Sequence, residues 1–140
     1  MKKSIIGVLL LFSLCGNAQS ADSIAIRQTM LDYVEGYFNA DWQRVSKAVH
    51  PELVKRIMVT DSSGQTAVNN QGASMLILGA KRNKKPDTSV PFKAEVYIYD
   101  IFKNTAVAKI ETNKFQFIDY AQLVKIGGEW KILNVLWALK

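Results

Sequence analysis

The residues of this chain that could do acid–base chemistry are one histidine and one aspartate. His50 is the only histidine among 140 residues, and an imidazole titrates near neutral pH, as a general acid or base must. Asp119 lies in the apolar stretch FQFIDYAQL, where a covered carboxylate needs a partner. Lys109 or Arg56 would supply that partner. Each residue also has a structural interpretation: His50 would end a helix, and Asp119 would form half of a buried ion pair.

A binding pocket could be built from the remaining polar and aromatic residues. Arg56 would hold a carboxylate, a phosphate or the carbonyl edge of a flat ring, or would instead pair at the surface with Glu52, four residues earlier. Aromatic side chains would stack on the ring, although each of them also suits an ordinary core. The expected pocket residues are Tyr33, Tyr37, Trp42, His50, Arg56, Tyr97, Lys109, Asp119 and Trp137.

Metal and cofactor chemistry is not expected from this sequence. The chain has one histidine and one cysteine, Cys15, so a zinc site would depend on carboxylates for its other ligands. It shows no glycine-rich phosphate loop, nucleophile elbow or paired catalytic carboxylates. The sequence therefore favours a binding protein without a cofactor over a familiar class of enzyme.

Residues 1–18 have the pattern of a secretory signal peptide. Two lysines near the start precede an apolar run that ends at Cys15, and small residues lead to Ala18, after which we predict cleavage. The alternative is a lipoprotein anchored at Cys15, which the large Leu14 before it disfavours. Because the apolar run is shorter than the roughly 20 residues that span a bilayer, we predict a periplasmic or secreted protein without stable membrane insertion.

The mature chain, residues 19–140, has the size of a single domain. Loss of the two lysines in the signal lowers the formal net charge from +6 to +4. The basic cluster KRNKK at 81–85 reads as a solvated loop, and a broad basic face with interleaved aromatics is missing from the sequence, so nucleic acid is not an expected partner. Without a cysteine, the mature chain would be held together by its core alone.

The elements that must position these residues are helices followed by strands. Apolar residues at helical spacing predict helices over 23–39 and 72–81, the first capped by Asp22 or Ser23. A short helix between them would begin at Asp41 and end near Val49, before Pro51. Turns are expected at DSSGQ (61–65) and at the glycine pair 127–128. Strands are expected over 56–60, 92–102, 105–112, 115–126 and 129–139.

This order predicts an α+β fold in which three helices pack on one face of a strongly curved, mostly antiparallel sheet. A cupped sheet closed by helices leaves a cone-shaped cavity, and small molecules bind in such concavities.

Two long segments resemble a known family. They are LDYVEGYFNADWQRVSKAVHPELVKRIM and FIDYAQLVKIGGEWKILNVLWA, and they are similar to a bacterial family of the nuclear transport factor 2-like superfamily that is labelled "putative lumazine-binding". The resemblance implies the cone fold and a small-molecule pocket. That superfamily includes isomerases, dehydratases and noncatalytic domains, so the fold alone does not give a function. The proton-abstracting aspartate of the isomerases would fall at about Ile57, beside Arg56, and neither residue can replace a carboxylate base.

We therefore expect a secreted homodimer that binds a small hydrophobic or heterocyclic molecule in its cone-shaped pocket. Two alternatives remain open. One is a cofactor-independent isomerase or dehydratase that uses His50 or Asp119 as acid or base, and the other is a dimeric accessory domain whose surface is its function. A cavity in which His50 and Asp119 face one substrate position would favour the first alternative, and backbone or surface partners for both would disfavour it.

Overall fold

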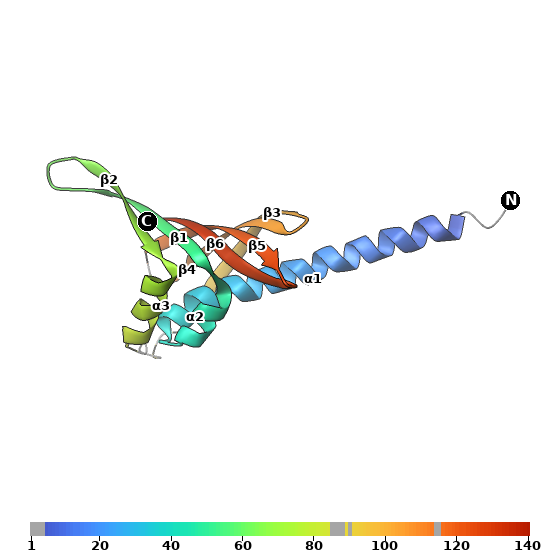
Figure 1. Cartoon of the computed structure of the whole chain (residues 1–140), viewed down its shortest axis with the longest axis horizontal. Helices are drawn as coiled ribbons and strands as arrows, with labels where there is room; N and C mark the ends of the chain where they lie inside the picture. The colour runs from blue at the N-terminus through green and yellow to red at the C-terminus, as the bar shows by residue number, and fades with distance from the viewer. Residues whose placement is uncertain (1–4, 85–88, 90, 114–115) are drawn as a thin grey trace.

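The computed structural model describes residues 5–84, 89, 91–113 and 116–140, with side chains from Gln19 onward. Three helices, α1 (Ile5–Phe38), α2 (Trp42–Ala48) and α3 (Ala73–Arg82), lie on one side of a curved sheet (Figure 1). The sheet has six strands in the order β2-β1-β6-β5-β4-β3, and only the β1–β6 pairing is parallel. The strands are β1 (Val49–Thr60), β2 (Thr66–Gly72), β3 (Ala94–Phe102), β4 (Thr105–Thr112), β5 (Phe117–Ile126) and β6 (Glu129–Leu139). The expected α+β class is confirmed.

Helix α1 starts earlier than its predicted N-cap. The helix runs through Asp22, whose carboxylate instead accepts hydrogen bonds from Lys125 Nζ (2.7 Å) and Trp130 Nε1 (2.9 Å). Ile24 is 67% exposed. The buried apolar residues of the helix are Ile26, Met30, Tyr33 and Val34. Their spacing keeps one face of the helix on the sheet.

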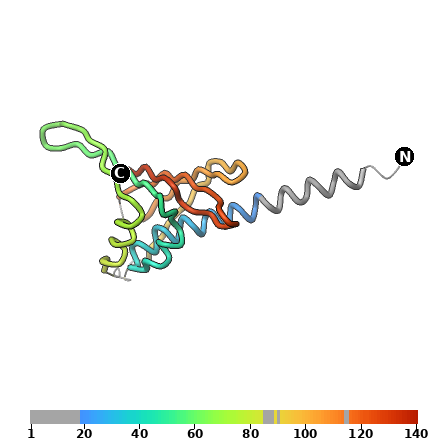
Figure 2. The backbone as a smooth tube through the Cα atoms, viewed as in Figure 1, coloured from blue at the N-terminus to red at the C-terminus, as the bar shows by residue number. Residues whose placement is uncertain are grey.

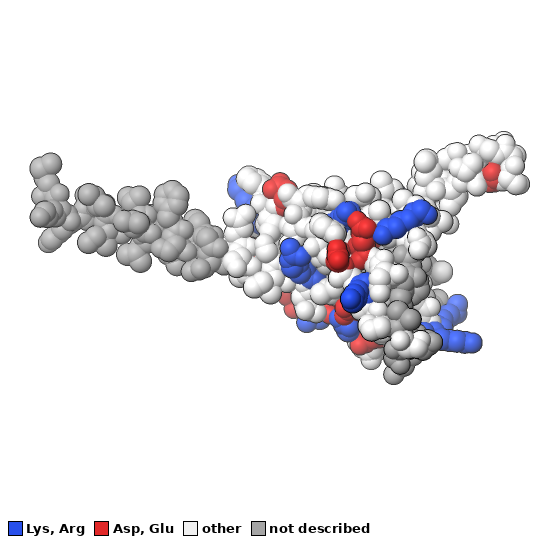
Figure 3. All heavy atoms as spheres, turned by 180° about the vertical axis from the view of Figure 1, so that it is seen from behind, with Lys and Arg blue, Asp and Glu red and all other residues white. Residues whose placement is uncertain are grey.

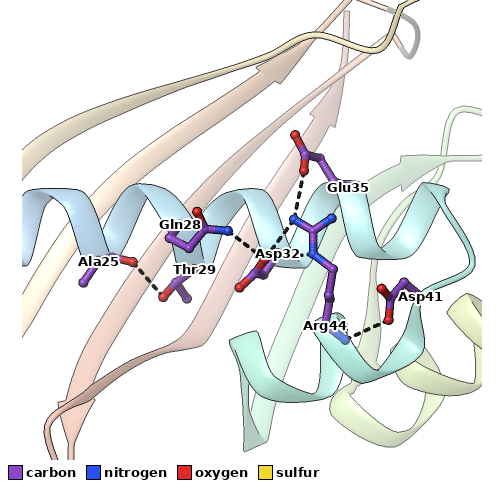
Figure 4. A network of polar contacts seen from close by, with 7 residues as sticks. All are labelled: Ala25, Gln28, Thr29, Asp32, Glu35, Asp41 and Arg44. Carbon is purple, nitrogen blue, oxygen red and sulfur yellow. Dashed lines mark hydrogen bonds and ion pairs between the residues drawn. The ribbon is translucent and has the colours of Figure 1, made fainter.

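The corner between α1 and α2 is fixed by a polar network (Figure 4). Asp41 caps α2, as predicted, by accepting from the backbone N–H of Arg44 at 3.2 Å. The Arg44 guanidinium reaches back to α1, where it binds Asp32 at 2.8 Å and Glu35 at 2.9 Å. A Cβ on Gly36 would lie 3.0 Å from the Arg44 Cβ, so the two helices approach closely only because this residue is glycine.

Strand β1 corrects the prediction for the segment after α2. Helix α2 ends at Ala48, close to the predicted end, but the strand expected over 56–60 already begins at Val49. Pro51 is tolerated because it lies where the pairing of β1 with β6 shifts register, between Val49 and Val54, so a missing N–H does no harm there.

Strand β2 was not predicted at all. Its residues, TAVNNQG, are almost entirely exposed and show no apolar run, so the strand exists through its pairing with β1. The predicted turn at 61–65 closes this hairpin, and the Asp61 carboxylate accepts from the backbone N–H groups of Ser63 (2.8 Å) and Gln65 (2.9 Å). Figures 1 and 2 show the hairpin projecting beyond the rest of the sheet.

The remaining elements follow the prediction. Helix α3 and strands β3 to β6 agree with the expected ranges to within two residues, apart from residue 115, which lies outside the described residues. Gly127 and Gly128 have φ values of 59° and 84°, as the tight turn between β5 and β6 requires. Ile110, Leu123 and Ile132 are fully buried on the sheet face that the helices cover. We call this face the inner face, and the opposite one the outer face.

Candidate functional site

A cavity of about 290 Å³ lies between the inner face and helices α1 and α3. Its wall is largely aromatic and aliphatic, with a few polar groups. Ligand pockets have this composition, because apolar walls provide affinity and a few polar groups fix orientation. The lining residues are Tyr33, Val34, Tyr37, Phe38, Lys55, Gln71, Leu76, Phe117, Asp119 and Trp137.

The polar centre of the cavity consists of Tyr33, Lys55 and Asp119, from α1, β1 and β5. The Tyr33 hydroxyl donates to Asp119 Oδ2 at 2.5 Å, and Lys55 Nζ donates to the same oxygen at 2.8 Å. Lys55 Nζ also donates to the Tyr33 hydroxyl oxygen at 2.6 Å. Three residues far apart in the sequence therefore meet around a single carboxylate oxygen.

Burial sets the electrostatics of this cluster. The side chains of Asp119 and Lys55 are 1% and 11% exposed. Burial lowers the pKa of Lys55 below its ordinary value, although the charge of Asp119 opposes the shift. Burial, and then the charge and hydrogen bond of Asp119, raises the pKa of Tyr33 well above its usual range. Tyr33 therefore keeps its proton and acts as a donor at neutral pH.

The second oxygen of Asp119 is the unusual group of the cavity. Oδ1 is buried, and no hydrogen-bond donor for it occurs in the part of the chain that the structure describes. An unpaired buried acceptor is costly, so such an atom calls for an explanation in terms of strain, solvent or a ligand. Asp119 borders the cavity, so a turn of its carboxyl group would present this oxygen to a ligand with an N–H or O–H group.

Aromatic rings surround the ammonium group. Lys55 Nζ lies 4.9 Å from the centre of the Trp137 ring, 5.3 Å from that of Tyr33 and 6.0 Å from that of Phe117. At these distances the ring faces stabilise a cation. Phe38 stacks on Phe117 with centroids 5.8 Å apart, which continues the aromatic wall. The arrangement suits a flat ring that bears polar atoms along one edge.

Four of the expected pocket residues line this cavity: Tyr33, Tyr37, Asp119 and Trp137. The expectation that Lys109 or Arg56 would pair with Asp119 is wrong, because Lys55 does so. Successive side chains of a strand point to opposite faces. Lys55 is therefore on the inner face and Arg56 is on the outer one.

Arg56, Tyr97 and Lys109 lie on the outer face, contrary to the prediction. Strand register places Tyr97 opposite Lys109, and Arg56 is exposed beside an outer groove. Lys109 Nζ binds Glu111 at 2.5 Å and lies 4.3 Å from the centre of the Tyr97 ring. No ion pair between Arg56 and Glu52 occurs within the described ranges.

His50 and Trp42 also lie outside the cavity lining. His50 belongs to β1 instead of ending a helix, and its Nδ1 accepts from the backbone N–H of Glu52 at 3.2 Å. Trp42 opens α2, where Lys81 Nζ lies 4.0 Å from its ring centre. His50 therefore does not share a substrate position with Asp119.

Sequence reasoning missed Lys55 and several apolar lining residues. The signal for Lys55 was present, because Leu53, Lys55 and Ile57 alternate with Val54 and Arg56, and Leu53 is buried in the core. A strand begun at residue 49 would have placed Lys55 inward. The other lining residues missed were Val34, Phe38, Gln71, Leu76 and Phe117.

Two further properties concern the described residues alone. None of their helices combines the length and apolar character of a membrane-spanning segment. Within the same ranges, no three His, Cys, Asp or Glu side chains gather in a way that could hold a metal ion.

The family follows from comparison with known proteins. The family model described as "Putative lumazine-binding" matches residues 21–138. The chain belongs to this family. The match includes every lining residue of the cavity described above. No curated protein matches the chain.

Solved structures share the fold of this family member. An NTF2-like protein of unknown function from Shewanella baltica OS155 is 22% identical, with a TM-score of 0.71 over 86% of this chain and 95% of its own. One from Methylobacillus flagellatus KT is 23% identical, with a TM-score of 0.63 over 86% and 93%. A structure described as a "putative scytalone dehydratase" from Novosphingobium aromaticivorans is 12% identical, with a TM-score of 0.59 over 89% and 88%. These likenesses show the nuclear transport factor 2-like fold.

Proposed function

We propose that this protein binds a small flat heterocycle in the cavity and is not primarily a catalyst. The observation that carries the proposal is the buried cluster of Tyr33, Lys55 and Asp119, which leaves one Asp119 oxygen without a donor among the described residues. The family description supports a heterocyclic ligand.

The cluster offers an acceptor and a donor side by side. Once the carboxyl group turns toward the cavity, a ring N–H would donate to Asp119 Oδ1, and an adjacent ring carbonyl would accept from Lys55 Nζ, which has a further proton to give. An imide or lactam edge has this pattern. Trp137 and Phe117 would contact the ring faces, and hydrogen bonds to charged groups in a covered site are among the strongest available.

A titration with 6,7,8-trimethyllumazine tests the proposal, because this compound has an imide edge and its fluorescence reports binding. Lys55→Met should weaken binding about 10-fold or more, as expected for the loss of a charged hydrogen bond. Arg56→Met is the matched control, because the neighbouring residue faces away from the cavity, and it should leave the affinity unchanged.

Two results would count against this reading: no binding to the wild-type protein, or equal losses in the two variants. Since Lys55→Met leaves Asp119 buried without its cation, the variant could unfold. The double variant Lys55→Met/Asp119→Asn removes both charges and keeps the test valid, with circular dichroism as the check on folding.

We also propose that the protein is exported to the periplasm or secreted after cleavage behind Ala18. The support is the pattern of residues 1–18, a basic start followed by an apolar run and small residues. Mass spectrometry of the protein from the periplasm of its own host should find an N-terminus at Gln19. A chain that keeps its signal, or one lipidated at Cys15, would contradict this proposal.

The outer face supports a further proposal, that two copies associate through it. Tyr99, Val107, Tyr120 and Leu136 are between 39% and 58% exposed there, and Val107, Tyr120 and Leu136 border a groove of about 450 Å³. Exposed apolar patches of this kind commonly mark interaction surfaces. In native mass spectrometry, Leu136→Lys should convert a wild-type dimer into a monomer, whereas a monomeric wild-type protein would refute the proposal.

A catalytic alternative rests on Asp119 alone. Its carboxylate borders the cavity next to the Tyr33 hydroxyl, so it could exchange a proton with a bound carbonyl compound, whereas His50 lies elsewhere. Proton NMR in D₂O of a bound carbonyl ligand would show exchange at carbon in the wild-type protein and none in Asp119→Asn. The absence of exchange in the wild-type protein would leave binding as the function.

A further inference from the structure

A second hollow of about 350 Å³ adjoins the cavity on the side of strand β2. Lys55, Gln71 and Trp137 border both hollows, so the two form one cleft that runs from Asp119 toward the β1–β2 hairpin. The residues that border only the second hollow are Ile57, Asn69, Asn70 and Met75. A molecule seated on Asp119 and longer than one ring would extend into this second hollow.

The second hollow is polar but almost uncharged. Strand register places Gln71 opposite Lys55, and Asn69 opposite Ile57, so both carboxamides lie on the inner face. No hydrogen bond to the side chains of Asn69, Asn70 or Gln71 occurs in the described ranges, although Gln71 is half-buried. Over 57–71 the only charged residue is Asp61, at the hairpin turn, and Figure 3 shows an acidic spot near the tip of the projecting hairpin.

This composition selects among ligand classes. Carboxamides donate and accept hydrogen bonds without carrying charge, so they match hydroxyl groups in either role. A phosphate would call for arginines or free lysines, and Lys55, the one cation among the described residues that border the hollow, is already held by Asp119. An alkyl chain would remove the carboxamides from water without replacing their hydrogen bonds. Ile57 and Met75 would pack against the carbon atoms of a polyol.

We propose that the second hollow is a subsite for an uncharged hydroxylated chain, a polyol or a sugar, attached to the ring that occupies the cavity. The inference rests on the proposed function, since it assumes that a ring binds beside Asp119. It adds that the natural ligand carries a polar tail, and that Asn69 and Gln71 recognise it. Asn69 is the more informative residue, because it borders only the second hollow.

Two ligands that differ only in the tail provide the test. These are 6,7,8-trimethyllumazine and 6,7-dimethyl-8-ribityllumazine, which carry a methyl group and a ribityl chain on the same nitrogen. The ribityl compound should bind the wild-type protein about 10-fold more tightly, as one or two net hydrogen bonds would provide. Asn69→Leu should remove most of this advantage and leave the affinity for the trimethyl compound unchanged.

Gln65→Leu is the matched control, because it removes a carboxamide from the same hairpin outside both hollows. Equal affinity of the wild-type protein for the two compounds would overturn the subsite and leave the proposed function intact. Equal loss of both ligands in Asn69→Leu would overturn it too, since the residue would then act on the whole fold. If the wild-type protein binds neither compound, the proposed function fails and this inference fails with it.

Discussion

Each face of the sheet has a lysine that pairs with a carboxylate beside a tyrosine, but the surroundings of the two sets differ. On the inner face Lys55 pairs with Asp119 beside Tyr33, and on the outer face Lys109 pairs with Glu111 beside Tyr97. The Asp119 side chain is 1% exposed, whereas that of Glu111 is 28% exposed. The two sets offer similar functional groups, and the burial of the carboxylate distinguishes them.

The pKa values of Lys55 and Lys109 are shifted in opposite directions. Burial lowers the pKa of Lys55, and the attraction of Asp119 only partly compensates. The hydrogen bond to Glu111 raises the pKa of Lys109, because it outweighs the opposing effect of desolvation. A group whose charge is costly to keep is sensitive to whatever enters its cavity, which is the reason for placing the ligand at the inner set.

The largest expected effect comes from breaking the inner pair. Asp119→Ala leaves the Lys55 ammonium buried without its partner, and this should lower the free energy of unfolding by about 3 to 5 kcal/mol. Urea unfolding followed by circular dichroism measures the loss. Glu111→Ala, the matching change on the outer face, should have little effect. Similar losses in the two variants would show that burial does not separate the two faces.

The next largest loss of stability is expected from a substitution of a buried leucine on the inner face. Leu123 is 1% exposed on the inner face, and Leu136 is 58% exposed on the outer face. Leu123→Ala should cost about 2 to 5 kcal/mol of stability through lost burial and a residual cavity. Leu136→Ala should stay within about 0.5 kcal/mol in dilute protein. Thermal unfolding at low protein concentration checks the pair, and a large loss in Leu136→Ala would contradict the assignment of an open outer face.

The sequence was sufficient for most of the fold. Helical spacing located α3, alternation located β3 to β6, and the glycine pair located the turn at 127–128. Strand β2 was not predicted because its residues are exposed and polar, so only pairing with β1 makes it a strand. The early start of β1 was not predicted because Pro51 suggested the end of a helix. The proline is accommodated by a register shift that the sequence does not reveal.

The site was harder to predict than the fold because alternate residues of a strand point to opposite faces, and the sequence does not show which face is covered. Arg56 was expected in the pocket and its neighbour Lys55 was not considered, and a shift of one residue reverses the face of a strand. Tyr97 and Lys109 failed similarly, since an alternating strand does not show which of its faces the helices cover. The meeting of Tyr33, Lys55 and Asp119 depends on long-range packing, which local patterns do not encode.

The hydroxyl of Tyr33 allows a smaller test that depends on pH. Tyr33→Phe should lower stability at pH 7 by about 1.5 to 3 kcal/mol, because it removes a hydrogen bond to a charged group. The folded state holds the pKa of Tyr33 well above the value of about 10 in an unfolded chain. Above that pH the unfolded state binds fewer protons, so the wild-type protein loses stability as pH rises.

The Tyr33→Phe variant does not lose stability in this way at high pH, because phenylalanine has no proton to release. The difference in stability between wild type and variant should therefore shrink between pH 10 and pH 11, and urea unfolding across this range measures it. Lys55 contributes in the opposite sense, because its lowered pKa means that the unfolded state binds more protons as pH approaches the ordinary lysine value. A constant difference across the range would show that Tyr33 ionises as readily in the folded protein as in the unfolded chain.

The smallest effect on stability is expected for Lys109→Met, which breaks the ion pair of the outer face. Water solvates the outer pair, so the urea midpoint should stay close to that of the wild-type protein, and added salt should make the two still more similar. A large loss would mean that the outer set is covered in solution, as it would be between two associated copies. Repeating the measurement at decreasing protein concentration separates these cases, because stability that depends on association falls with dilution and stability within one chain does not.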